Sequence, residues 1–258
     1  MITIKEALTK KEMKDYVMFS FELYKNNPNW IPPIIAEELE TFDKTKNPAL
    51  LTAEAHFYLA YKDDKIVGKI AAIINWDEVN ILHKRKTRFG WFDAIDDIEV
   101  TKALLNKVEE LGRKHNMDHI EGPMGFSNLD KVGILSEGFD QLGNMITWYS
   151  QPYYITHLEQ LGYIKEKEYI ESDFSFKGIN PEPFQKASEL IKKRYELRCL
   201  NFTKTKDIMP YVDKMFDLFN ETYSKLQSFV PINDIQKAYF KKKYIGFINP
   251  EFIKFIVD

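Results

Sequence analysis

Three carboxylates, those of Asp96, Asp97 and Glu99, stand where the strand-like run 88–95 passes into a helical pattern. A strand that leads into a helix is a common phosphate site, because free backbone N–H groups and the positive end of the helix dipole point outward there. Acidic side chains repel phosphate. The spacing fits a capping box, with Asp96 as the N-cap and Glu99 three residues later. This structural role would occupy the N–H groups that a phosphate needs, and the alternative is a catalytic or metal-binding role.

Ser127 and Asn128 lie in a loop that contains two glycines and a proline, after a strand expected near residues 119–124. Polar side chains at the carboxyl end of a strand are a favoured place for ligand contacts. We therefore expect Ser127 and Asn128 to contact a small-molecule ligand if this region binds one. The alternative is an irregular turn that the glycines and the proline require.

Aromatic residues gather ahead of Gly162, at Trp148, Tyr149, Tyr153 and Tyr154. Aromatic side chains at this density usually pack in a core. The alternative is a wall that recognises a substrate.

The basic run 83–88 precedes the strand-like run directly. We expect a solvated loop there, and the alternative is a surface site for an anion. Metal chemistry is disfavoured, because the five histidines show no H-x-x-x-H spacing and Cys199 is the single cysteine. We expect neither a metal ion nor an internal disulfide.

Composition limits the class of protein. The chain has 258 residues, 44% of them hydrophobic and 29% charged, which suits one globular domain or one domain and part of another. A net charge of -3 does not suggest nucleic-acid binding. The first residues lack the pattern of a signal peptide, and no apolar run reaches the ~20 residues that span a bilayer. We expect a soluble, cytoplasmic protein without membrane or nucleic-acid partners.

The elements that must position these residues follow from hydrophobic periodicity. The pattern predicts helices at 10–24, 31–42 and 152–161, and a further helix directly after the strand-like run 88–95, with an apolar stripe within residues 101–111. It predicts strands at 3–7, 56–61, 66–75, 88–95, 119–124 and 166–176. The expected fold class is α+β, with a mixed, mostly antiparallel sheet flanked by helices.

A linker-like stretch at 177–183 is followed by a second round of the opening pattern. Strands are expected at 197–202 and 252–257, with helices at 209–226 and 235–244 between them. Matching strands of the two rounds are offset by a similar distance, as an internal duplication requires. We expect a first domain at 1–177, a linker and helix at 178–194, and the first half of a second copy at 195–258.

This element order, with the motif Gly-Tyr-Ile-Lys-Glu-Lys-Glu-Tyr at 162–169, resembles the GNAT superfamily of acetyl-CoA-dependent N-acetyltransferases, in its tandem two-domain form. The resemblance implies acetyl-CoA or another acyl-CoA as cofactor. In that family a strand splays from its neighbour to admit the pantetheine arm, and a tyrosine on a later helix protonates the leaving thiolate. By this resemblance Phe92, Ala94 and Tyr153 are candidates for substrate or cofactor binding, and Tyr154 is the catalytic candidate.

The chain departs from the family at the loop that wraps the CoA pyrophosphate, of pattern Arg/Gln-x-x-Gly-x-Gly/Ala. Its basic position falls on Asp96, and its two glycines fall on Glu99 and Thr101. Glycines allow the backbone to approach the phosphates, and a carboxylate several ångströms away repels a phosphate by ~1 kcal/mol or more. The usual tyrosine position holds Leu158, so Tyr154, one turn earlier, would have to substitute.

The resemblance therefore implies an N-acetyltransferase-like protein whose first domain is catalytically degenerate, with acidic residues in place of the pyrophosphate loop. The alternative is an active N-acyltransferase that moves an acyl group from acyl-CoA to a small amine, using the second domain or an atypical site. A small-molecule ligand and a homodimer are the expected partners.

Overall fold

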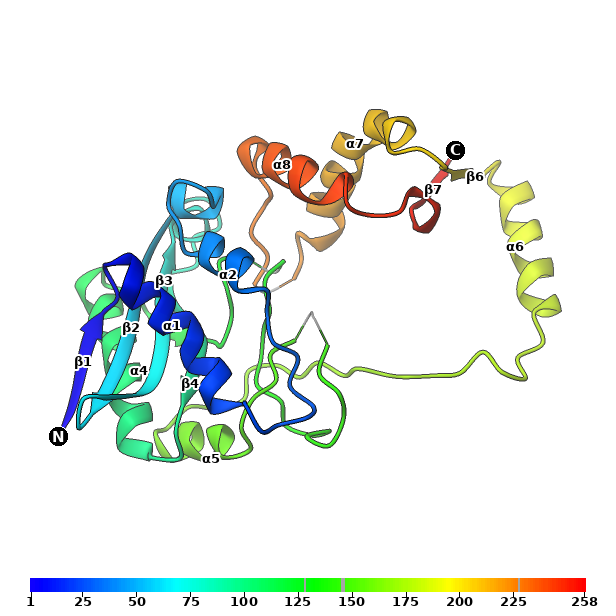
Figure 1. Ribbon diagram of the computed structural model, residues 1–258. Helices are drawn as coiled ribbons and strands as arrows, with labels where there is room; N and C mark the ends of the chain where they lie inside the picture. The colour runs from blue at the N-terminus through cyan, green and yellow to red at the C-terminus, as the bar shows by residue number, and fades with distance from the viewer. Residues whose placement is uncertain (128, 145–146, 227) are drawn as a thin grey trace. The chain divides into compact units, whose positions relative to one another are not determined.

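A computed structural model describes residues 1–127, 129–144, 147–226 and 228–258 (Figure 1). The chain divides into two compact units. The first unit comprises Met1–Glu168 with Leu226–Val230, and the second comprises Tyr169–Lys225 with Pro231–Asp258. Each unit is described by itself.

A five-stranded sheet forms the centre of the first unit, in the order β1-β2-β3-β4-β5. The strands are β1 (Ile2–Glu6), β2 (Ala53–Lys62), β3 (Lys65–Asn75), β4 (Lys86–Ala94) and β5 (His119–Glu121). The first three pairings are antiparallel, and β5 runs parallel to β4. The predicted α+β class with a mixed, mostly antiparallel sheet is confirmed.

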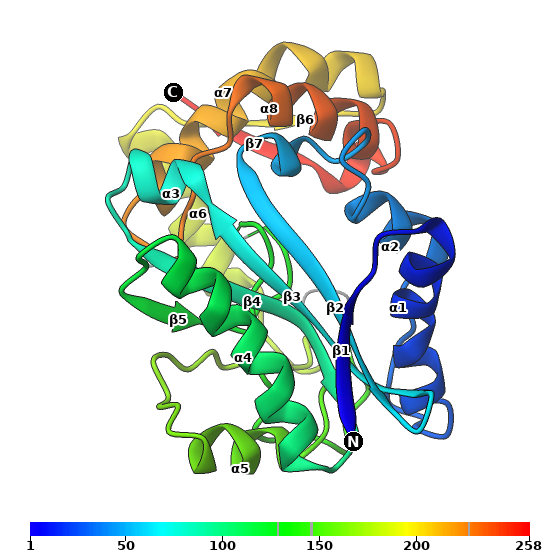
Figure 2. The same ribbon diagram turned by 90° about the vertical axis from the view of Figure 1, so that its left-hand side faces the viewer.

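Helices cover both faces of this sheet (Figure 2). On one face lie α1 (Lys10–Leu23) and α2 (Ile35–Thr41), over a core that includes Tyr16, Phe57 and Trp91. On the other face lie α4 (Ile98–Lys114) and α5 (Tyr153–Gln160). The short helix α3 (Trp76–Asn80) follows β3, and a 3-10 turn spans Pro48–Leu51.

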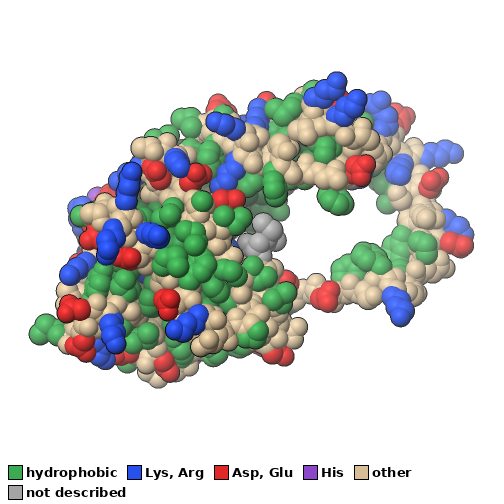
Figure 3. Space-filling view, viewed as in Figure 1, with side chains coloured by type: hydrophobic (Ala, Val, Ile, Leu, Met, Phe, Trp, Pro, Cys, Tyr) green, Lys and Arg blue, Asp and Glu red, His purple; other side chains and the backbone are tan. Residues whose placement is uncertain are grey.

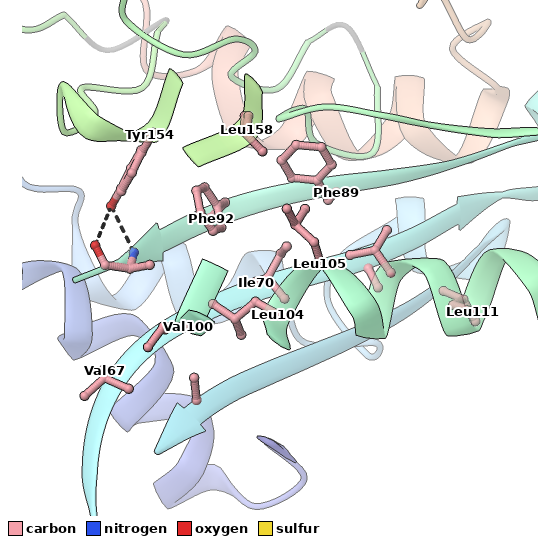
Figure 4. Packing of buried hydrophobic residues seen from close by; sticks show 14 of the residues in the cluster. Val67, Ile70, Phe89, Phe92, Val100, Leu104, Leu105, Leu111, Tyr154 and Leu158 are labelled. Carbon is pink, nitrogen blue, oxygen red and sulfur yellow. Dashed lines mark hydrogen bonds between the residues drawn. The ribbon is translucent and has the colours of Figure 1, made fainter. Parts of the chain in front are cut away.

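Helix α4 packs on the sheet through an apolar stripe. Its buried residues recur at helical spacing and pack on Ile70 and Phe89 (Figure 4): Val100, Leu104, Leu105, Val108 and Leu111. The same core holds Leu158 and Tyr154 of α5.

A bulge interrupts β4. Lys69 pairs with Asp93 and Ala71 with Gly90, so two residues of β4, Trp91 and Phe92, stand opposite one residue of β3. Trp91 has φ 44°, a left-handed conformation that non-glycine residues rarely adopt. As a result Phe89 and Phe92 both pack on the α4 side, while Trp91 packs on the α1 side.

Three sequence predictions are wrong in detail. First, the N-cap of α4 is Asp97 and not the expected Asp96. Second, residues 166–176 are all described and none belongs to a strand; the segment is extended and exposed.

Third, the basic run is not a solvated loop throughout. Lys86 and Arg88 are buried and pair with Glu78, at 3.0 and 2.9 Å, and Lys86 also pairs with Glu121. The side chains of β4 therefore bury charge as well as apolar surface, and each buried cation has a carboxylate partner.

The second unit contains α6 (Glu182–Arg194), β6 (Arg198–Asn201), α7 (Thr205–Tyr223), α8 (Asp234–Phe240) and β7 (Lys254–Val257). A short π-helical turn, Lys241–Ile245, extends α8, and a 3-10 turn spans Pro250–Phe252. Strands β6 and β7 pair antiparallel. The helices and strands expected beyond residue 183 are therefore present, with small shifts at their ends.

Replacing Leu104 by alanine tests the packing of α4. The substitution should lower the unfolding free energy of the first unit by ~2–5 kcal/mol, because it leaves a cavity in a fully buried site. All four tryptophans lie in this unit, so urea unfolding followed by tryptophan fluorescence reports on it. The control Lys102→Ala removes an exposed side chain of the same helix and should change stability by less than ~0.5 kcal/mol. Equal effects of the two would contradict this packing.

Candidate functional site

A cavity of about 200 Å³ opens in the first unit, on the α1 side of β4. Aromatic side chains form much of its wall: Tyr24, Trp30, Trp91, Phe92, Trp148 and Tyr149. Its acidic and basic residues are Glu38, Lys69, Asp93, Asp130 and Lys131. Aromatic walls with a few convergent charged groups are typical of a small-molecule site.

Apolar side chains also reach the surface beside this cavity. Ile31 and Leu129 line it and are 42% and 44% exposed, and Ile34 of the α1–α2 connection is 65% exposed. Hydrophobic side chains gather on the face of the first unit seen in Figure 3. A ligand in the cavity could therefore extend an apolar part over its rim.

The Asp93 carboxylate is the most heavily bonded group of the cavity. Ser20 donates to its Oδ2 at 2.6 Å, and Tyr24 and Tyr154 donate to its Oδ1 at 2.9 and 3.2 Å. The Lys69 ammonium lies 3.7 Å from Oδ2. Burial, followed by the neighbouring Asp93 charge, raises the pKa of both tyrosines well above the ordinary value.

Tyr154 lies in the cavity wall, but its hydroxyl is already engaged. It accepts from the Ala94 N–H at 2.9 Å and lies 3.2 Å from the Ala94 carbonyl oxygen (Figure 4). Its raised pKa means that loss of its proton beside Asp93 is unfavourable. The geometry favours a role in orienting Asp93 and β4, and its role as a proton donor stays a prediction.

Glu38 and Lys131 face the same cavity with fewer partners. Burial raises the pKa of the Glu38 carboxyl, against the opposing effects of Lys69, Lys131 and a hydrogen bond from Trp91. Burial lowers the pKa of the Lys131 amine, with Glu38 and Asp93 acting against the shift. Both residues are half-buried and retain some solvent access.

The start of α4 lies on the opposite side of β4 from Trp91 and is closed by its own side chains. Asp97 accepts from the Glu99 N–H at 3.0 Å and pairs with Lys62 at 2.9 Å. Asp96 lies 3.2 Å from the His157 ring, whose other nitrogen contacts the Thr101 hydroxyl at 2.9 Å. A phosphate at this helix start would meet two carboxylates, so these residues do not fit a CoA pyrophosphate.

The other predicted residues are dispersed. Phe92 lines the cavity, while Tyr153 uses its hydroxyl to donate to the Ala94 carbonyl at 2.7 Å. The Ser127 backbone N–H donates to Asp130, and its side chain is not in the cavity wall. Asn128 lies outside the described residues.

Sequence reasoning missed the charged residues of the cavity. Asp93 carried a signal, because it is a single acid inside an otherwise apolar strand-like run. Glu38 and Lys131 carried none, since they lie in a weak helix and in a loop far apart along the chain.

Among the described residues no helix is long and apolar enough to cross a membrane, and no group of three or more His, Cys, Asp or Glu could hold a metal ion.

In the first unit α4 crosses from β4 to a parallel β5, and the order of strands and helices is that of an α+β fold with a mostly antiparallel sheet. No protein-family model matches the chain. Among solved structures, a GNAT-family acetyltransferase from Staphylococcus aureus Mu50 aligns with this chain at a TM-score of 0.35 and 22% sequence identity. The alignment covers 46% of this chain and 72% of the acetyltransferase chain.

Two curated relatives are similar along most of the chain. Protein YghO of Escherichia coli is 28% identical over 91% of this chain and 60% of its own length. A bacterial ceramide synthase of Caulobacter vibrioides is 24% identical over 96% of this chain and 64% of its own length. The chain thus spans less than two thirds of either relative.

Replacing Asp93 by asparagine tests the bonded carboxylate. An amide cannot accept from three hydroxyls as a carboxylate does, and Lys69 would lose its buried counter-charge. We expect the unfolding free energy to fall by ~1–3 kcal/mol in urea titrations. The exposed control Asp140→Asn should leave it within ~0.5 kcal/mol. A loss no larger than that of the control would contradict the role assigned to Asp93.

Replacing Asp97 by alanine tests the helix start. We expect a loss of ~0.5–2 kcal/mol at pH 7, because one free N–H group of α4 loses its acceptor. The hydrogen bond from Lys62 holds the pKa of Asp97 below its ordinary 3.8, so the stabilisation is present above that pH and is lost as pH falls through the lower folded-state value. Urea titrations between pH 7 and 3 measure this, with Asp96→Ala as the neighbouring control. A larger loss in the control would show that Asp96 is the cap.

Proposed function

We propose that this is an N-acyltransferase-type protein whose first unit binds an amine acceptor and lacks a conventional site for CoA. The observation that carries the proposal is that the cavity and the start of α4 lie on opposite sides of β4. Carboxylates face an aromatic cavity on one side, and the start of α4 on the other side is closed by acidic side chains.

The helix start supports the absence of a conventional pyrophosphate site. Asp97 already accepts from a backbone N–H group of α4 and forms an ion pair with Lys62, a cation that could otherwise meet a phosphate. The Asp96 and Asp97 charges would oppose a diphosphate at this position, and no glycine lets the ligand approach the backbone.

The far end of β4 supports the same proposal. In the GNAT family the pantetheine arm enters beside a splayed strand. Here β4 pairs with β5 over Lys86–Arg88. Farther along β4, Ala94 has both backbone groups bonded to tyrosine hydroxyls of α5. Those hydroxyls occupy the hydrogen-bonding groups that a pantetheine amide would need.

The cavity supports an amine as its ligand. A protonated amine is attracted by the carboxylates of Glu38 and Asp93 and by the faces of the surrounding aromatic rings. The apolar rim at Ile31 and Leu129 suits an amine with an apolar substituent. A ceramide is a fatty-acid amide, so the similarity to a bacterial ceramide synthase also supports an amine acceptor.

The alternative is an active N-acyltransferase that holds acyl-CoA in the second unit or at an atypical site. The 24% identity with a bacterial ceramide synthase over 96% of the chain favours it. We further propose that residues 195–258 are the first half of a second GNAT-like copy. The sequence β6-α7-α8-β7, with its antiparallel strand pair, repeats the order of β1-α1-α2-β2 and supports this reading.

Isothermal titration at low ionic strength tests the proposal. Tryptamine, an aromatic amine, should bind the 258-residue chain, and acetyl-CoA should give no heat at millimolar concentration. Glu38→Gln should weaken tryptamine binding about tenfold by removing a charge partner. The matched control Glu37→Gln, which changes an exposed neighbour on α2, should leave it unchanged. Micromolar binding of acetyl-CoA would overturn the loss of the CoA site, and absence of tryptamine binding would overturn the amine site.

A further inference from the structure

The Lys131 ammonium lines the cavity without a direct partner. It makes no hydrogen bond, and no ion pair within 4.0 Å, to any residue that the structure describes. Lys69, the other lysine of the wall, differs in this respect. It is 3% exposed, lies 3.7 Å from Asp93 and sits over the Tyr16 ring at 4.9 Å. Lys131 is therefore the cation of the cavity that remains available to a ligand.

The carboxylates of the wall divide in the same way. Asp93 has three hydroxyl donors and a lysine, and Asp130 accepts from the Ser127 backbone N–H. Glu38 has no ion pair within the described part of the chain, and the Trp91 indole and the two lysines of the wall oppose the rise of its pKa. Among the described residues of the wall, Glu38 and Lys131 are therefore a carboxylate and an ammonium that have no ion-pair partner within 4.0 Å.

From these two groups we infer that the cavity takes a zwitterion of the amino-acid type, with its ammonium on Glu38 and its carboxylate on Lys131. This inference rests on the proposed amine site and narrows its ligand to compounds that carry an anionic group beside the amine. A simple amine pairs with Glu38 and offers no negative charge to the half-buried Lys131 ammonium. A zwitterion pairs both charges, and a charge-assisted hydrogen bond to each is the stronger kind.

The burial of both groups agrees with this assignment. Loss of solvent disfavours the charged form of Glu38 and of Lys131, and each acts on the other as a partial counter-charge. A bound zwitterion would place the missing opposite charge next to each of them. The aromatic wall then selects for a hydrophobic substituent on the same ligand.

The experiment compares tryptophan with tryptamine, which lacks only the carboxylate, by isothermal titration of the full 258-residue chain. We expect tryptophan to bind about tenfold more tightly. Lys131→Met should abolish this preference while leaving tryptamine binding in place, and Lys131→Arg should retain it. Lys44→Met, at an exposed position after α2, is the control and should change neither affinity. Circular dichroism of each variant checks that it folds.

The outcomes separate the two proposals. Equal affinities for tryptophan and tryptamine would overturn the zwitterion and leave the amine site standing. A preference for tryptophan that survives Lys131→Met would also overturn the assignment of Lys131. Binding of neither compound would overturn the amine site itself, and the zwitterion with it.

Discussion

The burial of Asp93 is the constraint on which the first unit depends. A carboxylate removed from water costs several kcal/mol unless hydrogen bonds and a counter-charge replace the lost solvation. Here the replacements come from three directions: Ser20 of α1 and its C-cap residue Tyr24, Lys69 of β3, and Tyr154 of α5. One buried charge therefore fixes a helix on each face of the sheet against the end of β4.

The bulge in β4 makes this arrangement possible. Its left-handed Trp91 costs of order 1–3 kcal/mol, and such strain persists only where the surroundings hold it. Gly90 beside it is required, because a Cβ there would lie 2.2 Å from the Met124 carbonyl oxygen. The bulge places Trp91, Phe92 and Asp93 in the cavity wall, and Phe92 also packs in the core under α4. Strain, close approach and buried charge thus coincide at the candidate site.

Local signals explain what the sequence could predict. The stripe on α4 and the alternation in β2 need only neighbours along the chain, and both elements form where expected. Asp96 and Asp97 have the same capping chemistry, so the choice between them depends on backbone geometry and on Lys62, which lies 35 residues away. Residues 166–176 have the composition of a strand, but a strand also needs a partner edge, which composition does not supply. The bulge breaks the alternation on which strand reasoning relies.

The candidate site was predictable only in part for the same reason. Tyr154 and Phe92 lie in the cavity wall because they share β4 and α5 with the core, which periodicity detects. Glu38 and Lys131 meet through tertiary structure alone. The cavity that Glu38 and Lys131 line lies on the α1 side of β4, and the capped start of α4 lies on the other side. No side chain that lines the cavity also caps α4. Under the proposed function, the acidic side chains at the start of α4 oppose phosphate binding without touching the cavity, so the first unit would hold an acceptor without holding CoA in the conventional way.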